Sequence, residues 1–170
     1  MKLLTPGQAR ELDRVSMADM GISIERLMGN AGKQVAEEAM EMVSDIHDSS
    51  ILILSGKGNN GGDGFAAATV LFENNYNIRV HSLYKNSLIK GESLNFYLKC
   101  ESLGIFTTFG ELLPDFKIPD LIIDGLLGTG FKGALRKSMI PWVEWINNSK
   151  SMVLSIDISS GLNGNSGRVN

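Results

Sequence analysis

The residue types best suited to chemistry lie in one glycine-rich segment and at two aspartates farther along the chain. The segment at 58–64 reads GNNGGDG and directly follows an apolar run at 51–54. Asp124 and Asp157 each follow another short apolar run and precede a glycine-bearing stretch. Glycines permit positive φ angles and close approach of a ligand, and amides at a helix start attract anions, so the segment predicts a phosphate- or anion-binding loop. The two aspartates are candidates for a functional pair beside it.

Two familiar phosphate-binding patterns fit the glycine segment incompletely. The stretch at 56–61 matches the GxGxxG pattern of dinucleotide-binding folds, but residues 81–85, at the end of the second predicted strand, offer no acid to hold a ribose. A P-loop would need Gly-Lys-Ser/Thr at the helix start, and Lys57 lies on the wrong side. The alternative to an anion site is therefore a tight turn that binds no ligand, with Asp63 as the cap of the following helix.

The same segments also offer oxygen ligands for a cation. Asn60, Asp124 and Ser160 carry an amide oxygen, a carboxylate and a hydroxyl, which suit a hard cation rather than zinc. One carboxylate among neutral oxygens favours a monovalent ion. His47 and His81 have no partner at metal-ligand spacing, so we expect both to be structural.

The elements that position these residues follow from turn signals and apolar spacing. Thr5 and Pro6 predict the start of a helix that Gly21 ends, and Ser23 caps a second helix whose apolar residues continue to Ile46. From residue 50 onward, short apolar runs alternate with helical segments. The predicted strands are 51–54, 78–84, 105–109, 121–123 and 152–156, and the predicted helices among them include 65–72, 93–102 and 141–147.

This alternation of strands and helices is typical of a parallel sheet in a single α/β domain. Parallel strands bring the segments at Asn59, Asp124 and Asp157 to the same edge, where ligands bind in open α/β sheets. We therefore expect the functional site at that edge.

The composition narrows the class of protein. The chain has 170 residues, a formal net charge of −3 and a pI near 5.4, which argues against nucleic acid as the main partner. Cys100 is the single cysteine, so no internal disulfide is possible and a cytoplasmic location is expected. No apolar segment has the form of a signal peptide or a membrane span, so we expect no membrane association.

Three motifs read together resemble one known family. They are GNNGGDG at 58–64, DGLLGTG at 124–130 and DISSGL at 157–162, preceded by Gln8, an ELD stretch at 11–13 and LMGNAG at 27–32. The pattern is similar to the NAD(P)H-hydrate epimerase family, the YjeF N-terminal domain. The resemblance implies a Rossmann-like three-layer α/β/α sandwich with a mostly parallel central sheet. It also implies a potassium-assisted isomerase that interconverts the R and S forms of hydrated NADH and NADPH (NADHX and NADPHX).

The resemblance implies a role for each matching residue. Asp157 would act as catalytic acid or base near the reacting carbon, and Asn60, Asp124 and Ser160 would hold the potassium ion. The residues that would contact the hydrated nucleotide are Asn59, Asn60, Gly61, Gly62, Asp63, Gly128, Thr129, Gly130, Phe131, Lys132, Gly133, Ala134 and Asp157.

The resemblance also bears on domain organisation and partners. Family members continue into further strands, so we expect residues 1–170 to form a single YjeF N-terminal-like domain that lacks those C-terminal strands. The domain would then be part of a longer protein, fused to or partnered with a dehydratase. A homodimer through an exposed apolar face of the N-terminal helices is a reasonable expectation. Two alternatives stay open: a non-catalytic nucleotide- or protein-binding scaffold module of the same fold, and an ordinary NAD-binding oxidoreductase.

Overall fold

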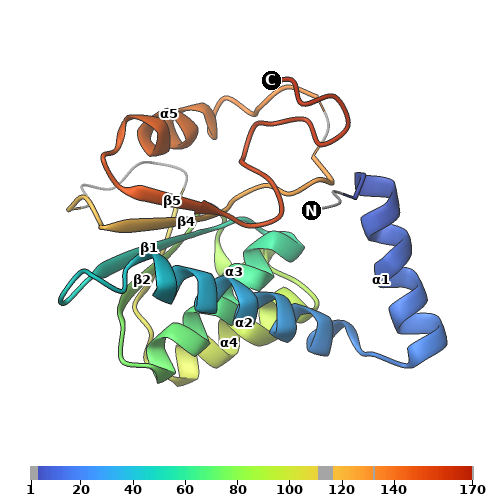
Figure 1. Ribbon diagram of the computed structural model, residues 1–170, viewed down its shortest axis with the longest axis horizontal. Coiled ribbons are helices and arrows are strands. Elements are labelled where there is room, and N and C mark those ends of the chain that lie inside the picture. Colours follow the sequence, from blue (N-terminus) through green and yellow to red (C-terminus); the bar gives the residue numbers. More distant parts are fainter. Residues whose placement is uncertain (1–3, 111–116, 132, 170) are drawn as a thin grey trace.

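The chain forms three layers, with a parallel sheet between two layers of helices (Figure 1). The computed structural model describes residues 4–110, 117–131 and 133–169. Neighbouring strands are parallel throughout the sheet, which confirms the predicted α/β sandwich. The strands are β1 (Ser50–Ser55), β2 (Asn77–Ser82), β3 (Thr107–Phe109), β4 (Leu121–Gly125) and β5 (Met152–Ser155), in the order β3-β2-β1-β4-β5.

β1 lies at the centre of the sheet because its side chains are apolar on both faces. Ile51 and Ile53 are buried in the core under one helical layer, and Leu52 and Leu54 in the core under the other. A continuous apolar run is suited to such two-sided burial. Since β1, β4 and β5 are neighbours, the segments that follow them meet at one edge, as predicted.

Three helices cover one face of the sheet: α2 (Ile24–Met42), α3 (Asn59–Glu73) and α4 (Glu92–Ser102). The other face is covered by α5 (Ile140–Asn148), and a short 3-10 turn, η1 (Asn86–Leu88), precedes α4. The predicted extension of the second helix to Ile46 is wrong. The helix ends at Met42, and the Ile46 side chain is exposed to solvent instead of packing in the core.

α1 (Pro6–Met20) stands at one side of the sandwich, away from the sheet (Figure 1). Thr5 forms a capping box with Gln8, and Gly21 ends the helix with a φ of 64°, as the residue types predict. Pro6 is buried, and a Cβ on Gly164 would lie 2.9 Å from its ring. The first turn of α1 therefore packs against the last part of the described chain.

The glycine-rich segment is helical. α3 begins at Asn59 with Gly58 as its N-cap, so Asp63 lies inside the helix and does not cap it. The predicted positive φ angles are also absent from this stretch of the described chain. The glycines instead allow close packing: a side chain at Gly61 would overlap the carbonyl oxygen of Gly56, and one at Gly62 would crowd α2. The predicted loop is wrong because these glycines serve the approach of α3 to its neighbours.

His81 on β2 is part of the core. Its ring stacks on Trp142 of α5 with centroids 4.6 Å apart, and its nitrogens lie 2.7 Å from Thr108 Oγ1 and 2.9 Å from the Gly110 carbonyl. Burial lowers the pKa of His81, which favours the neutral ring. These contacts support the predicted structural role. Within the described residues, the helices fall short of the length and apolarity that a membrane span requires.

Candidate active site

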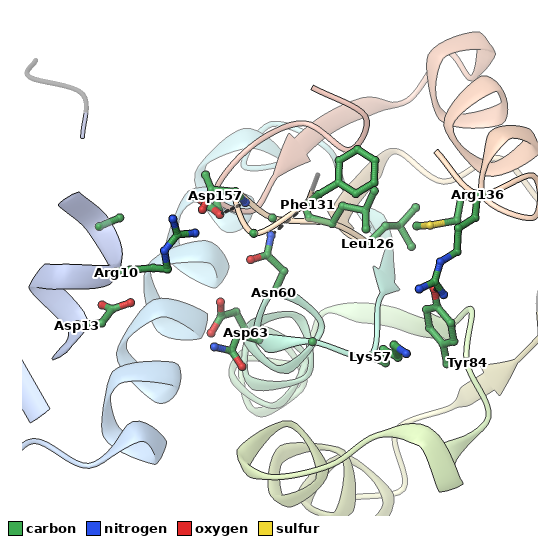
Figure 2. A pocket seen from close by; sticks show the side chains of 18 of the residues that line it. Arg10, Asp13, Lys57, Asn60, Asp63, Tyr84, Leu126, Phe131, Arg136 and Asp157 are labelled. Atoms are coloured by element: carbon green, nitrogen blue, oxygen red, sulfur yellow. Dashed lines mark hydrogen bonds between the residues drawn. The ribbon is translucent and has the colours of Figure 1, made fainter. Parts of the chain in front are cut away.

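A pocket of about 630 Å³ lies at the carboxyl edge of the sheet. Its walls come from α1, the first turns of α3, and the segments that follow β1, β2, β4 and β5. Figure 2 shows side chains from α1 and α3 directed into the same space as Asp157. Small-molecule sites typically enclose about 300–1,000 Å³, so this pocket has the size of a ligand site.

Asp157 is held in a defined position at one end of the pocket. It adopts a φ of 64°, a left-handed conformation that is costly for a residue other than glycine. Its Oδ2 accepts a hydrogen bond of 2.6 Å from the backbone amide of Thr129. A Cβ on Gly128 would lie 2.8 Å from this same oxygen, so a glycine is needed there. The segments after β4 and β5 thus fix a carboxylate that is exposed to a ligand.

Asn60 joins the three segments that meet at this edge. From the first turn of α3, its Nδ2 donates hydrogen bonds to the backbone carbonyls of Leu127 at 3.0 Å and Ile156 at 2.8 Å. Those carbonyls belong to the segments after β4 and β5. Asn60 therefore connects the start of α3 to the backbone segment that contains Asp157.

Asp63 lies farther along α3, partly buried, at the same end of the pocket as Asp157 (Figure 2). Burial, followed by the negative charges of Asp157 and Asp13, raises the pKa of Asp63 from 3.8 to about 7. Asp13 comes from α1, and Arg10 of the same helix also points into this end. Three carboxyl groups from different elements, those of Asp13, Asp63 and Asp157, thus face one space.

The opposite end of the pocket is basic and aromatic. The Lys57 Nζ lies 5.4 Å from the centroid of the Tyr84 ring, and Arg136 donates a hydrogen bond of 3.3 Å to the Tyr84 hydroxyl. Figure 2 places this group across the pocket from Asp63 and Asp157. The pocket therefore has an acidic end beside α1 and a basic end beside Tyr84.

Asp124 is buried behind the pocket wall. Its Oδ1 accepts hydrogen bonds from the Leu126 amide at 3.2 Å and the Ser160 hydroxyl at 2.6 Å, and its Oδ2 accepts one from the Ser160 amide at 2.9 Å. The Ser160 hydroxyl in turn accepts a hydrogen bond of 3.0 Å from the Leu127 amide. Burial raises the pKa of Asp124, although the bonds from Ser160 and Leu126 act in the other direction.

Asp124 and Ser160 line a separate cavity of about 330 Å³ beside α5. The expectation that Asp124 and Asp157 form one functional pair therefore needs correction, because the two carboxyl groups open onto different cavities. The physical reason is their position: Asp124 is the fourth residue of β4 and is covered by the segment after β5, whereas Asp157 lies beyond the end of β5.

Most of the predicted nucleotide contacts line the pocket. Gly61 and Gly62 do not, because they are buried where α3 meets Gly56 and α2. Gly133 is exposed outside the lining, and Lys132 falls outside the described residues. The predicted residues that line the pocket are Asn59, Asn60, Asp63, Gly128, Thr129, Gly130, Phe131, Ala134 and Asp157.

Several pocket residues were not predicted from the sequence. Arg10 and Asp13 are three residues apart on one helix, and this spacing places both side chains on the same face of α1. The local sequence does not show, however, that α1 reaches the edge of the sheet. Lys57 and Tyr84 lie two residues beyond the ends of β1 and β2, and in a parallel sheet residues just after the strands are candidates for the ligand site. The unpredicted lining residues are Ala9, Arg10, Asp13, Lys57, Gly58, Tyr84, Leu126, Leu127, Arg136 and Met139.

Comparisons with known proteins agree with one another. Residues 24–170 match a family described as YjeF-related protein N-terminus. A protein from Elusimicrobium minutum named NAD(P)H-hydrate epimerase is 31% identical over 99% of this chain and 79% of its own length. An Archaeoglobus fulgidus protein named bifunctional NAD(P)H-hydrate repair enzyme Nnr is 38% identical over 86% of this chain, which covers 30% of that protein. The crystal structure of yeast YNL200c matches with a TM-score of 0.87 and 22% identity, over 100% of this chain and 75% of that one.

Proposed function

The chain belongs to the YjeF-related N-terminal family, and from this premise we propose that it is an isomerase that interconverts the R and S epimers of hydrated NADH and NADPH. Its relatives named NAD(P)H-hydrate epimerase support this reaction. The main structural support for the proposal is the position of Asp157. Its carboxylate accepts a hydrogen bond from the Thr129 amide and lines the pocket at the edge of the sheet.

The charge distribution of the pocket supports a dinucleotide substrate in one orientation. The N-cap Gly58 offers no side chain to the first amides of α3, so these amides are available to a phosphate. Lys57 and Arg136 add positive charge on the side of Tyr84. The phosphates would lie toward these groups, and the hydrated nicotinamide ring would lie at the acidic end beside Asp157.

The chemistry requires that one bond break and re-form. The carbon–oxygen bond at C6 of the hydrated ring breaks, the lone pair of the ring nitrogen stabilises the resulting cation, and oxygen returns on the other face. Asp157 would exchange a proton with the C6 oxygen and stabilise the positive charge by its own negative charge. Asn60 and Thr129 act as positioning residues, because they fix the backbone around Asp157.

The test is direct conversion of the purified R epimer of NADHX to the S epimer, followed by chromatography. Asp157→Asn should reduce kcat by about 100-fold or more, the usual contribution of a general acid or base, while the substrate still binds. Lys137→Gln is a matched control, since Lys137 is an exposed cation that does not line the pocket. Unchanged turnover in Asp157→Asn would remove Asp157 from the mechanism.

We also propose that a potassium ion binds through Asn60, Asp124 and Ser160. Their hard oxygens fit a monovalent cation. Asn60 lines the main pocket, whereas Asp124 and Ser160 line the cavity beside α5, but Leu127 between them links all three into one hydrogen-bonded cluster. Among the described residues, no cluster of three His, Cys, Asp or Glu side chains forms a metal site of another kind. The bound ion would hold the segments after β4 and β5 together.

The potassium proposal is tested by thermal unfolding in matched concentrations of KCl, NaCl and choline chloride. We expect a higher Tm in KCl, because an ion bound to the folded state stabilises it. Ser160→Ala should remove that difference. Equal Tm values in all three salts would contradict the proposal.

The relatives also indicate a functional context. Bifunctional relatives extend well beyond the part that this chain matches, so we propose that the epimerase works with a dehydratase, either fused or separate. The exposed side chains of Leu12 and Met20 on α1 and of Ile24 at the start of α2 are compatible with a homodimer through these helices. Light scattering on the purified protein at several concentrations would give the oligomeric state.

A further inference from the structure

Asp63 presents a carboxyl group to the pocket without a hydrogen-bond partner among the described residues. Asp124, in contrast, accepts three hydrogen bonds. Fully enclosed polar side-chain atoms in the described part of the chain all have partners. The oxygens of Asp63 must therefore open onto the pocket, where they can meet a ligand.

The surroundings of Asp63 raise its pKa to about 7, so a substantial fraction of the carboxyl group is protonated at neutral pH. Asp157 faces it from the segment after β5, Asp13 and Arg10 face it from α1, and Lys57, which precedes the N-cap of α3, lies at the other end of the pocket. Burial is the largest cause of the raised pKa, and the charges of Asp157 and Asp13 add to it. Asp157, unlike Asp63, already accepts a hydrogen bond of 2.6 Å from the backbone amide of Thr129.

We propose that Asp63 is a second catalytic residue, which exchanges a proton with the C6 oxygen on the face of the substrate ring opposite to Asp157. This proposal rests on the proposed function and deepens it. A single carboxylate can serve only the face that it touches, whereas epimerisation needs oxygen to leave from one face and return to the other. Asp63 on α3 and Asp157 after β5 come from different walls of the same pocket end (Figure 2).

The protonated Asp63 carboxyl gives its proton to the C6 hydroxyl, and the carbon–oxygen bond breaks so that water leaves with the bonding electrons. The lone pair of the ring nitrogen forms a double bond to C6. Water then adds to the opposite face and loses a proton to the Asp157 carboxylate, which restores the neutral hydrated ring. The proton returns from Asp157 to Asp63 through solvent, or the reverse reaction uses the two groups in exchanged roles.

The first test compares the wild-type protein with Asp63→Asn on the R epimer of NADHX. We expect kcat to fall by about 100-fold or more, with KM changed by less than about threefold, because the amide fills the same space but cannot donate an acidic proton. Asp63→Glu should recover part of the lost turnover. Circular dichroism and thermal unfolding show whether each variant is folded.

The second test is the pH profile of kcat. The donor must be protonated, so wild-type kcat should decline as the pH rises through about 7, the pKa of Asp63. Asp13→Asn removes a negative charge that raises this pKa, so the decline should move to lower pH. Asp13 is exposed on α1, so its replacement should not affect folding.

The outcomes separate the two proposals. A wild-type protein that does not convert the R epimer contradicts the proposed function itself. If the wild type is active, Asp63→Asn with kcat within threefold of wild type and the same decline at high pH would overturn the role of Asp63. A rise in KM alone would assign Asp63 to substrate binding and overturn the role equally.

Discussion

Asp63 and Asp124 are both carboxyl groups whose pKa is raised chiefly by burial, yet their surroundings differ completely. Asp124 accepts hydrogen bonds from the Leu126 amide and from both the amide and hydroxyl of Ser160. Asp63 faces a pocket and two other carboxyl groups, Asp13 and Asp157. A raised pKa therefore does not by itself identify a catalytic group. What separates the two is whether protein donors already occupy the carboxyl oxygens.

The two sides of the Leu126–Gly128 segment therefore have different roles, one structural and one in the pocket. On one side, Asp124 and Ser160 fasten the segment after β5 to the end of β4. On the other, the same segment forms the pocket wall that faces Asp63. We expect replacements at Asp124 to act mainly on stability, and replacements at Asp63 to act mainly on turnover.

The largest expected effect is that of Asp124→Ala. It leaves the amides of Leu126 and Ser160 and the Ser160 hydroxyl without their acceptor, and unpaired buried groups cost about 1–3 kcal/mol each. We expect the free energy of unfolding at pH 7.5 to fall by about 3 kcal/mol or more in urea denaturation. Asp63→Ala is the matched control. An equal loss of stability in both variants would contradict the view that Asp124 is structural and Asp63 is not.

The next effect concerns the helix that carries Asp63. Gly61→Ala would push against the backbone carbonyl of Gly56, which cannot rotate away, whereas a Cβ at Gly58 would meet nothing within 4 Å. We expect Gly61→Ala to lower the free energy of unfolding by about 1–3 kcal/mol, as overpacking does. Gly58→Ala should cost about 1 kcal/mol or less. Similar values for both would show that α3 does not need this close approach.

A smaller effect is the pH dependence of stability due to Asp63. Its pKa is about 7 in the folded protein against an ordinary value of 3.8, so the folded state binds more protons between these values. Its contribution to stability is complete below about pH 4 and is lost as the pH rises through about 7. Urea denaturation across this range should show a decline that is weaker in Asp63→Asn. The same slope in both proteins would contradict the raised pKa.

The smallest expected effect is that of Ser160→Ala. It removes the hydroxyl that bonds Asp124, while the amide of the same residue still donates to that carboxylate. We expect a loss of about 1 kcal/mol in the free energy of unfolding, the usual net value of one hydrogen bond. The pH at which turnover declines should stay that of the wild type. A shifted decline would mean that the two sides of the segment are coupled.

Much of the fold could be predicted because its signals are local. The apolar run at 51–54 predicts a buried central strand, and Thr5, Pro6 and Gly21 mark the ends of α1 correctly. The boundaries that failed are those set by packing. α2 stops at Met42 although apolar residues continue to Ile46, and the glycine segment is the start of a helix.

The sequence alone determined which residue types could do chemistry and that β1, β4 and β5 would bring them to one edge, since strand direction and alternation follow from local pattern. Only the tertiary structure decided which of them face the same space. In the folded chain, Asp63 and Asp157 line the same pocket, to which α1 contributes Arg10 and Asp13. The carboxyl group of Asp124 instead lines a separate cavity. These outcomes depend on how closely α3 and α1 approach the sheet edge. Such distances are set by side-chain volumes from segments far apart in the chain, which no local pattern records.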